Sequence, residues 1–510
     1  MYQQGGTLAA NDISIHRGAD AILERVSLAV TPGSRIGVVG PNGRGKTTLL
    51  RALAGLEELD AGSISRNPPS LRVGYLPQER DVAQGESVLA YFARRSAEEV
   101  TDEFQARVSA ALRRVGLDVP LDRRVGELSG GERSRSALAS ILLSLFDVYL
   151  LDEPTNDLDF AGLELLECFV SELDGGVVVV SHDRAFLDSI VDRIVELESG
   201  TQRVHHYAGG WSEFEAARER ARAEHERAFA QWSEERARFG ELHRDRREEA
   251  RAAGKQANRR GTHALMSKTR AAARRIEWLE RDRVEKPWQP WELKLDLAPT
   301  GRSGDLVVTL EDAVVERGAF RLGPIDLDVR WSERISIAGP NGSGKTTLIE
   351  AILGRLPLSG GTRRVGPSVV FGEIGQGRSL FASDAPLIRS FCAESSLFEG
   401  EARTLLAKFD LYADHALRPA RSLSPGERTR AELALQAARG AGCLVLDEPT
   451  NHLDLPAVEE LERALSVFEG TLLLVTHDRR FLERVGVTRV FELSPAALAL
   501  DRLFSAKPKS

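Results

Sequence analysis

The chain has 510 residues, 28% of them charged and 42% hydrophobic, and its formal net charge at pH 7 is -8. No stretch approaches the roughly 18 consecutive apolar residues of a membrane-spanning helix, and residues 1–7 lack the basic and then apolar pattern of a secretion signal. The cysteines, Cys168, Cys392 and Cys443, are too isolated for a zinc site. These features exclude a membrane domain and predict a cytoplasmic chain with room for two domains.

The glycine-rich run GPNGRGKTT at residues 40–48 follows an apolar segment that reads as a strand and precedes a helical pattern. This is the context of a P-loop, whose backbone N–H groups turn inward on phosphates. Lys46 would neutralise the phosphates, and Thr47 could ligate Mg²⁺. The run therefore predicts an ATP site, with the contacts Gly40, Asn42, Gly43, Gly45, Lys46, Thr47 and Thr48.

Further motifs follow in the first half of the chain. Gln78 lies in a loop after a short apolar run, where it could sense the metal and the γ-phosphate. An apolar strand ends in Asp152 and Glu153; the aspartate could hold Mg²⁺ and the glutamate could deprotonate the attacking water. The strand at residues 177–180 leads to His182, which could bond the γ-phosphate. A predicted helix opens with an anion-binding element, Ser129, Gly130 and Gly131.

The middle of the chain, residues 211–286, is dense in Glu, Arg and Ala and keeps apolar residues at helical spacing. One seam contains Phe229, Trp232 and Phe239, and a second seam contains Ile276 and Leu279. Two such seams predict an antiparallel helical hairpin. Its predicted tip has no acidic residue and carries a set of bases that we name the basic tip: Arg251, Lys255, Arg259, Arg260, Lys268, Arg270, Arg274 and Arg275.

The basic tip is an electrostatic footprint for a nucleic-acid backbone, all the more so on a chain of negative net charge. A charged, solvated linker is the alternative interpretation of such a run.

The second half repeats the first at a nearly constant offset, which indicates duplication of one domain. The counterparts of the P-loop residues are Gly339, Asn341, Gly342, Gly344, Lys345, Thr346 and Thr347. Gln376, Asp447, Glu448 and His477 repeat the loop glutamine, the acid pair and the histidine, so Thr346, Asp447 and Gln376 become the second set of metal ligands, beside Thr47, Asp152 and Gln78. Ser424 and Gly426 repeat the anion-binding element, but Pro425 replaces a glycine and removes one backbone donor.

In this order the motifs resemble those of the ATP-binding cassette ATPases, twice over. The resemblance implies a P-loop α/β fold in each half and head-to-tail pairing of the halves within one monomer. ATP at Lys46 would then face Ser424 and Gly426, and ATP at Lys345 would face Ser129, Gly130 and Gly131. Where such ATPases usually stack an aromatic residue on the base, Arg17 and Arg317 stand here.

Tandem cassettes, an Asp-Glu-Pro-Thr-Asn run in both halves and a basic hairpin between them together resemble the ABC-F translation factors. The resemblance implies an ATPase that enters the ribosomal exit site and points its linker tip at the P-site tRNA and the peptidyl-transferase centre. Some members adjust translation and others confer antibiotic resistance. Asp157 departs from the second copy, which has His452. The energy subunit of a membrane transporter and a DNA-repair ATPase are alternatives.

We therefore expect a first cassette at residues 1–208, a helical linker with the basic tip at residues 209–300 and a second cassette at residues 301–500. A short tail would occupy residues 501–510.

Overall fold

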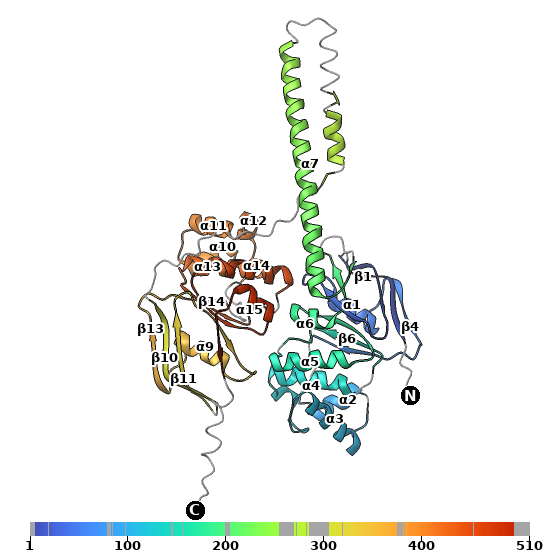
Figure 1. Ribbon diagram of the computed structural model, residues 1–510, viewed down its shortest axis with the longest axis vertical. Helices are drawn as coiled ribbons and strands as arrows, with labels where there is room; N and C mark the ends of the chain where they lie inside the picture. Colours follow the sequence, from blue (N-terminus) through green and yellow to red (C-terminus); the bar gives the residue numbers. More distant parts are fainter. Residues whose placement is uncertain are drawn as a thin grey trace, which may run out of the picture. The chain divides into compact units, whose positions relative to one another are not determined.

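The computed structural model describes residues 6–493 except 19, 79–82, 84, 97, 144–145, 157, 199–203, 254–269, 272, 282, 285–304, 319, 375–380, 382 and 452. The chain divides into two compact units: Met1–Trp211 with Trp291–Ser510, and Ser212–Pro290. The first unit contains both α/β cassettes and the second is helical (Figure 1). Among the helices that the structure describes, none combines the length and apolar character needed to cross a membrane.

The first cassette is built on a six-stranded sheet of order β5-β6-β7-β3-β8-β9. Its strands are β3 (Arg35–Val39), β5 (Val73–Leu76), β6 (Val148–Asp152), β7 (Gly176–Val180), β8 (Arg193–Leu197) and β9 (Val204–Ala208). All are parallel except β9, which pairs antiparallel with β8. Every residue of β6 and β7 is buried, as expected for parallel strands covered on both faces.

A second, antiparallel sheet of order β2-β1-β4 completes the strands of this cassette. It contains β1 (Thr7–Arg17), β2 (Asp20–Val30) and β4 (Ala61–Asn67). The apolar side chains of both sheets join one core around α1, in which Leu28, Val38, Leu50 and Val178 are buried. This core supports the P-loop, because β3 and α1 flank it.

The helices of the first cassette are α1 (Lys46–Ala54), α2 (Val88–Ser96), α3 (Asp102–Arg114), α4 (Gly130–Leu143), α5 (Phe160–Glu172) and α6 (Arg184–Ile190). Side-chain caps start four of them: Thr101, Ser129, Asp159 and Asp183 accept hydrogen bonds from backbone N–H groups in the first turns of α3, α4, α5 and α6. In Figure 1, α2 and α3 lie next to each other at the lower end of this cassette, apart from β1 and β4.

The second cassette repeats this plan. Its parallel sheet has the order β14-β15-β16-β12-β17, and its antiparallel sheet has the order β11-β10-β13. The strands are β10 (Leu306–Arg317), β11 (Phe320–Arg330), β12 (Arg334–Ala338), β13 (Gly360–Val365), β14 (Phe371–Ile374), β15 (Cys443–Asp447), β16 (Thr471–Val475) and β17 (Arg489–Glu492). The helices are α9 (Lys345–Leu353), α10 (Leu387–Ser395), α11 (Glu399–Lys408), α12 (Ala413–Leu417), α13 (Pro425–Ala438), α14 (Leu455–Ser466) and α15 (Arg479–Val485). The predicted tandem α/β fold is confirmed.

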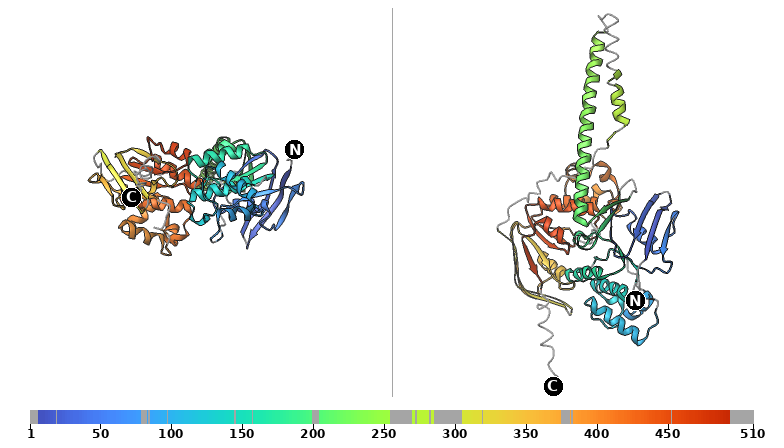
Figure 2. Two further views of the ribbon diagram at one scale, coloured as in Figure 1. Left: turned by 90° about the horizontal axis from the view of Figure 1, so that it is seen from below. Right: turned by 45° about the vertical axis from the view of Figure 1, so that its right-hand side comes forward.

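The second unit is the predicted helical hairpin. Most of it is α7 (Trp211–Ala253), an unbroken helix of 43 residues, and helical residues at 270–271 and 273–281 lie beside it (Figure 2). Trp232 donates from Nε1 to the carbonyl oxygen of Leu279 at 2.9 Å, while Arg275 pairs with Glu235 at 2.7 Å. Trp232 contacts Leu279, whereas Glu235, which is later in α7, contacts Arg275, which is earlier in the second segment. The two helices are therefore antiparallel.

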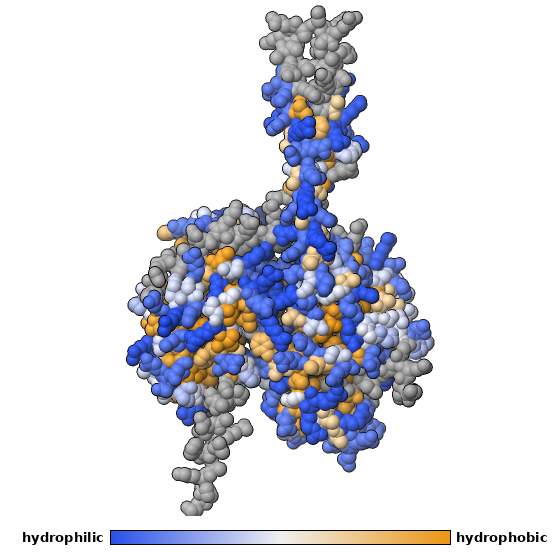
Figure 3. Space-filling model, in the orientation of Figure 1, coloured by the Kyte–Doolittle hydropathy of each residue, from blue (hydrophilic) through white to orange (hydrophobic). Residues whose placement is uncertain are grey.

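Much of the basic tip, Lys255, Arg259, Arg260 and Lys268, lies outside the described residues, and Arg251 lies in the last turn of α7. Arg270 and Arg274 are exposed. Arg275 differs: besides pairing with Glu235, its guanidinium lies 4.1 Å from the ring centroid of Trp278. Arg275 therefore packs within the hairpin stem, where hydrophilic residues with apolar patches between them cover the face shown in Figure 3.

Candidate active site

The carboxyl ends of β3, β6 and β7 meet at one edge of the first parallel sheet, because β7 pairs with both β3 and β6. The P-loop follows β3, Asp152 ends β6, and His182 comes two residues after β7. In open α/β sheets, ligands bind outside this edge. The topology thus brings together three motifs that are far apart in the sequence.

The P-loop wraps around the amino end of α1. Gly45 caps the helix at φ 84°, and a Cβ there would lie 2.8 Å from Ile22 Cγ2, so only glycine fits without strain. The largely buried Lys46 donates from Nζ to the carbonyl oxygens of Gly40 at 2.7 Å and Pro41 at 3.2 Å. Burial lowers the pKa of this ammonium group. The lysine is therefore held over the loop that would cradle the phosphates.

The acid pair at the end of β6 is buried, and its backbone is strained. Glu153 has φ 48°, a left-handed conformation that residues with a side chain seldom adopt. Burial raises the pKa of Glu153 to about 8 and lowers the pKa of His182 to about 3, so burial favours the neutral form of both groups. His182 Nε2 lies 3.2 Å from Glu153 Oε1. Backbone strain and shifted pKa values are typical of functional sites.

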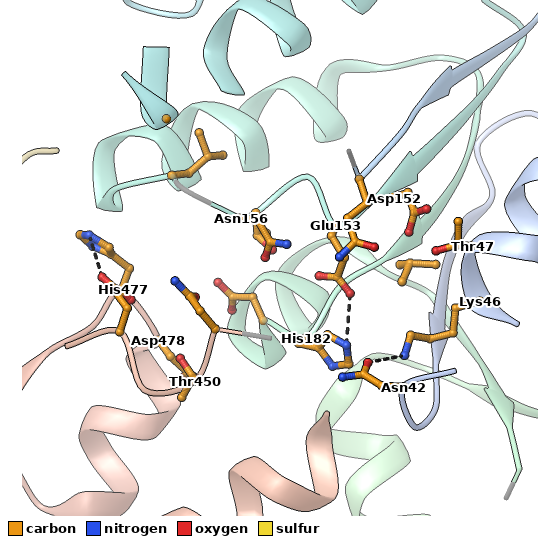
Figure 4. Close-up of a pocket in the computed structure, with 18 of the residues that line it drawn as sticks. Asn42, Lys46, Thr47, Asp152, Glu153, Asn156, His182, Thr450, His477 and Asp478 are labelled. Carbon is orange, nitrogen blue, oxygen red and sulfur yellow. Dashed lines mark hydrogen bonds and ion pairs between the residues drawn. The ribbon is translucent and has the colours of Figure 1, made fainter. Parts of the chain in front are cut away.

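These side chains open into a pocket of about 670 Å³. Figure 4 shows Lys46, Thr47, Asp152, Glu153 and His182 turned toward one another within it. The predicted residues of the first cassette that line it are Asn42, Gly43, Gly45, Lys46, Thr47, Thr48, Gln78, Ser129, Gly130, Gly131, Asp152, Glu153 and His182. The fold therefore collects nearly every site residue predicted in the first half of the chain.

The second cassette has the same arrangement. Lys345 donates from Nζ to the carbonyl oxygens of Gly339 and Pro340, at 2.7 and 3.2 Å. Glu448 has φ 46°, and burial raises its pKa to about 8, while burial lowers the pKa of His477 to about 4. A pocket of about 420 Å³ is lined by Asn341, Gly342, Gly344, Lys345, Thr346, Thr347, Asp447 and Glu448. Gln376 lies outside the described residues.

Each P-loop also receives a carboxylate from the other cassette. Asn341 donates its backbone N–H to Asp159 Oδ2 at 3.0 Å, and Asn42 donates its backbone N–H to Asp454 Oδ2 at 3.3 Å. Both aspartates cap helices that follow the Asp-Glu-Pro-Thr-Asn runs. Sequence reasoning missed them, although a Leu-Asp pair follows the run at the same distance in both halves. The contacts show that the two P-loops face the opposite cassette.

The two anion-binding elements differ in their placement. Ser129, Gly130 and Gly131 line the same pocket as Asn341 and Gly342, which belong to the second P-loop. Ser424 and Gly426 line neither of the two pockets described above.

Both serines form capping boxes, in which Glu132 and Glu427 bond the serine backbone N–H groups. Pro425 is the first residue of α13. Proline is favoured at this position, where no intrahelical partner for an N–H exists, so it leaves the helix intact and removes only an outward donor.

Two more residues escaped prediction. Phe320 lines the second pocket beside Arg317 and lies against Gly344 of the P-loop. In the first cassette, Ile22 lies against the corresponding glycine, Gly45. It was overlooked because it does not directly precede a glycine.

Tyr75, in β5, donates its hydroxyl to Asp152 Oδ2 at 3.3 Å. The corresponding residue of the second cassette is Glu373, which pairs with Arg355. Arg17 and Arg317 each line a pocket, as a base-stacking residue would.

The residues present fit a nucleotide with one magnesium ion. Asp152 Oδ1 and Glu153 Oε2 are buried without a hydrogen-bond partner in the described part of the chain, as are both ring nitrogens of His477. Thr346 donates to Asp447 at 3.0 Å, which joins a hydroxyl and a carboxylate at the predicted metal position. One carboxylate, one hydroxyl and phosphate oxygens are ligands that Mg²⁺ accepts.

Comparison with known proteins agrees with this geometry. The family described as "ABC transporter" matches residues 23–156 and 322–451. The tylosin resistance ATP-binding protein TlrC of Streptomyces fradiae is 35% identical over 91% of this chain and 93% of its own length. ABC transporter F family member 2 of Arabidopsis thaliana is 30% identical over 94% of this chain and 75% of its own length. The chain belongs to the ABC-F family.

A further ABC-F relative is the energy-dependent translational throttle protein EttA of Escherichia coli (strain K12), 30% identical over 91% of this chain and 88% of that protein. Membership confirms the predicted family and activity: the chain is an ATPase whose cassettes bind ATP. The roles of single residues rest on the geometry above and stay predictions.

The buried glutamates predict a pH dependence of stability in the nucleotide-free protein. Their pKa of about 8 in the fold lies above the ordinary 4.5, so the fold binds these protons more tightly than the unfolded chain. The contribution of these two glutamates to stability should therefore fall as pH rises from about 5 to about 8 and then level off, while the buried His182 and His477, whose pKa values are lowered from 6.5, oppose the fall in the lower part of this range. In Glu153→Gln with Glu448→Gln this fall should be shallower, as measured by thermal unfolding without nucleotide.

The exposed Glu219 of α7 supplies the control, because Glu219→Gln should keep the wild-type slope. Parallel slopes for the wild type and the double variant would show that the two carboxyls are not shifted.

Proposed function

We propose that this ATPase binds ATP with Mg²⁺ at two composite sites between its cassettes and couples ATP turnover to binding the ribosome. One observation carries the proposal: each half of the chain has its own set of predicted ATP-binding residues, and the two halves are connected by a helical hairpin whose predicted tip has basic but no acidic residues. ATP binding would close the cassettes, and hydrolysis would release them. The protein would act in the cytoplasm as a monomer, since one chain supplies both cassettes.

The chemistry of each site follows from its residues. Lys46 and the P-loop N–H groups would hold the β- and γ-phosphates, and Thr47 with Asp152 would hold the magnesium ion. Bound magnesium supplies positive charge to the phosphate oxygens. Glu153 would take the proton of the attacking water, and His182 would bond the γ-phosphate. In the second cassette Lys345, Thr346, Asp447, Glu448 and His477 would do the same.

The cross-contacts of Asp159 and Asp454 support composite sites, because they bring each P-loop against the other cassette. Ser129, Gly130 and Gly131 share a pocket with the second P-loop, as the head-to-tail pairing requires. Gln78 lines that pocket and could sense the metal, and Gln376 would be its counterpart. Ser424 and Gly426 would approach the first P-loop when ATP draws the cassettes together.

The ribosome is favoured as the partner by the basic tip and by the names of two relatives. EttA is named as a translational throttle and TlrC as a tylosin resistance protein. Within the hairpin, Arg270 and Arg274 are exposed and available to phosphates. We propose that the hairpin contacts rRNA from the exit site, with its tip toward the P-site tRNA and the peptidyl-transferase centre. The protein would then adjust translation or protect the ribosome from an antibiotic.

The energy subunit of a membrane transporter remains the alternative function. Such a subunit uses the same cassettes, and the family matched by both halves is described as "ABC transporter". It would need a permease and has no use for a basic helical hairpin. Ribosome binding distinguishes the two functions.

The first test uses Glu153→Gln with Glu448→Gln. Removing both bases leaves the phosphate and metal contacts intact, so ATP should still bind while hydrolysis falls about 10²-fold or more. The closed form should accumulate, and the variant should sediment with ribosomes when ATP is present. ATP turnover and co-sedimentation are the measurements.

Lys46→Ala with Lys345→Ala is the control, since it should abolish ATP binding and with it the ATP-dependent sedimentation. A trapped variant that ignores ribosomes would support the transporter function. Normal hydrolysis would disprove the assignment of the two glutamates.

The basic tip gives the second test. Arg259, Arg260, Arg270 and Arg274, replaced together by alanine, should leave basal hydrolysis near wild type because they lie outside every nucleotide motif. Ribosome affinity should fall and depend less on salt, since each lost phosphate contact removes roughly 0.7 to 0.9 from the log-log slope. Arg275 is kept because it packs in the stem.

A charge-matched control replaces four exposed arginines of α7, namely Arg220, Arg222, Arg227 and Arg238. This control should retain most of the affinity and the slope. Equal losses in the two variants would mean that net charge, and not the tip, attracts RNA.

Pro425 generates a third prediction, an asymmetry between the sites. Glu448→Gln disables the second site, so its residual turnover comes from the first site, which faces Pro425; Glu153→Gln leaves the second site instead. If the first site lacks a γ-phosphate donor, residual turnover should be about 10-fold lower in Glu448→Gln than in Glu153→Gln, which is the worth of one hydrogen bond to a charged group. Pro425→Gly in the Glu448→Gln background should recover much of the difference. Equal residual rates in the two single variants would remove the argument.

A further inference from the structure

A buried arginine crosses between the cassettes. Arg184 is the first residue of α6 and only 2% exposed. It donates from Nη1 to Glu462 Oε2 at 3.1 Å and from Nη2 to Glu462 Oε1, and Nη2 lies 3.6 Å from Asp478 Oδ2. Glu462 belongs to α14 and Asp478 caps α15, both in the second cassette. A two-pronged guanidinium–carboxylate pair of this kind fixes orientation as well as distance.

The position of this cluster in the chain ties it to both ATP sites. Arg184 comes two residues after His182, and Asp478 comes directly after His477. The two turns that carry the predicted γ-phosphate histidines are therefore joined through one arginine. A shift of either turn on nucleotide binding would move the other.

The related contact on the opposite side is weaker. The offset that relates His182 to His477 also relates Arg184 to Arg479 and Glu462 to Glu167. Arg479 lies 3.7 Å from Glu167 and 3.5 Å from Glu164, and its side chain is 39% exposed. The exposed pair contributes little, whereas loss of one partner from a buried pair is costly. The link through Arg184 is thus the stronger of two related contacts.

The charges around the pair explain why an arginine is needed. Asp183 and Asp478 cap α6 and α15, and they lie close enough that the charge of Asp478 helps burial to raise the pKa of Asp183. Two carboxylates this near repel each other. The guanidinium of Arg184 offsets that repulsion, so the turns can approach.

We infer that Arg184 is a positioning residue that couples the two ATP sites by holding the turn after His182 to the turn after His477. The inference rests on the proposed ATP sites in both cassettes but not on the ribosome. Coupling between sites commonly changes affinity 5- to 150-fold, and it acts equally in both directions. It should therefore appear as a dependence of one site on the occupancy of the other.

The test is a mutant cycle on the full chain with Lys345→Ala, which empties the second site. In the wild-type background this change should raise the ATP concentration for half-maximal turnover at the remaining site by about 5-fold or more. In the background of Arg184→Met with Glu462→Gln, the same change should have less than a 2-fold effect, roughly the limit of additivity. This background removes the guanidinium and the carboxylate of the buried pair together, so neither member of the pair is left without the other; Asp478 loses its 3.6 Å contact with Arg184.

Arg479→Met is the matched control and should keep the wild-type response to Lys345→Ala. Thermal unfolding checks each fold; if the Met/Gln pair unfolds, Arg184→Glu with Glu462→Arg restores the ion pair but repels Asp478, and it should also uncouple the sites. A response as large as wild type in a folded Arg184 variant, or no response in the wild type, would overturn the inference. Absence of any turnover would instead refute the proposed sites.

Discussion

The convergence of parallel strand ends at one sheet edge is the constraint on which the function of each cassette depends. β7 pairs with β3 on one side and β6 on the other, so the P-loop, Asp152 and His182 have to meet. The same order in the second sheet brings Lys345, Asp447 and His477 together. Buried valines and leucines hold the strands in register, and the polar side chains lie only where the strands end.

The predicted catalytic groups at that edge are held at a cost in stability. Glu153 and Glu448 both have left-handed backbone conformations, and burial raises the pKa of both carboxyls to about 8. Neither feature helps the empty protein to fold. A nucleotide with its metal would bring the positive charge and the hydrogen-bond partners that these buried groups lack. The strained, buried groups are therefore already placed to bind such a ligand.

The two halves share a plan but not every contact. Arg184 is buried against Glu462 where Arg479 is half-exposed, Tyr75 bonds Asp152 where Glu373 pairs with Arg355, and Phe320 stands at the P-loop where the first cassette has Ile22. Such differences allow two sites with the same motifs to turn over unequally. Together with the inter-cassette contacts, they suit a cycle in which one site influences the other.

The sequence by itself determined the tandem fold, the family, the ATPase activity and the hairpin, because glycine-rich loops, strand-end acids and helical spacing are local patterns. Domain boundaries and the roles of single residues remain predictions. Only the tertiary structure revealed Asp159, Asp454 and Arg184, since each acts on the other cassette through contacts between residues far apart in the chain. It also showed Arg275 within the stem, because counting charges along a sequence does not show which partners a folded helix brings to each of them.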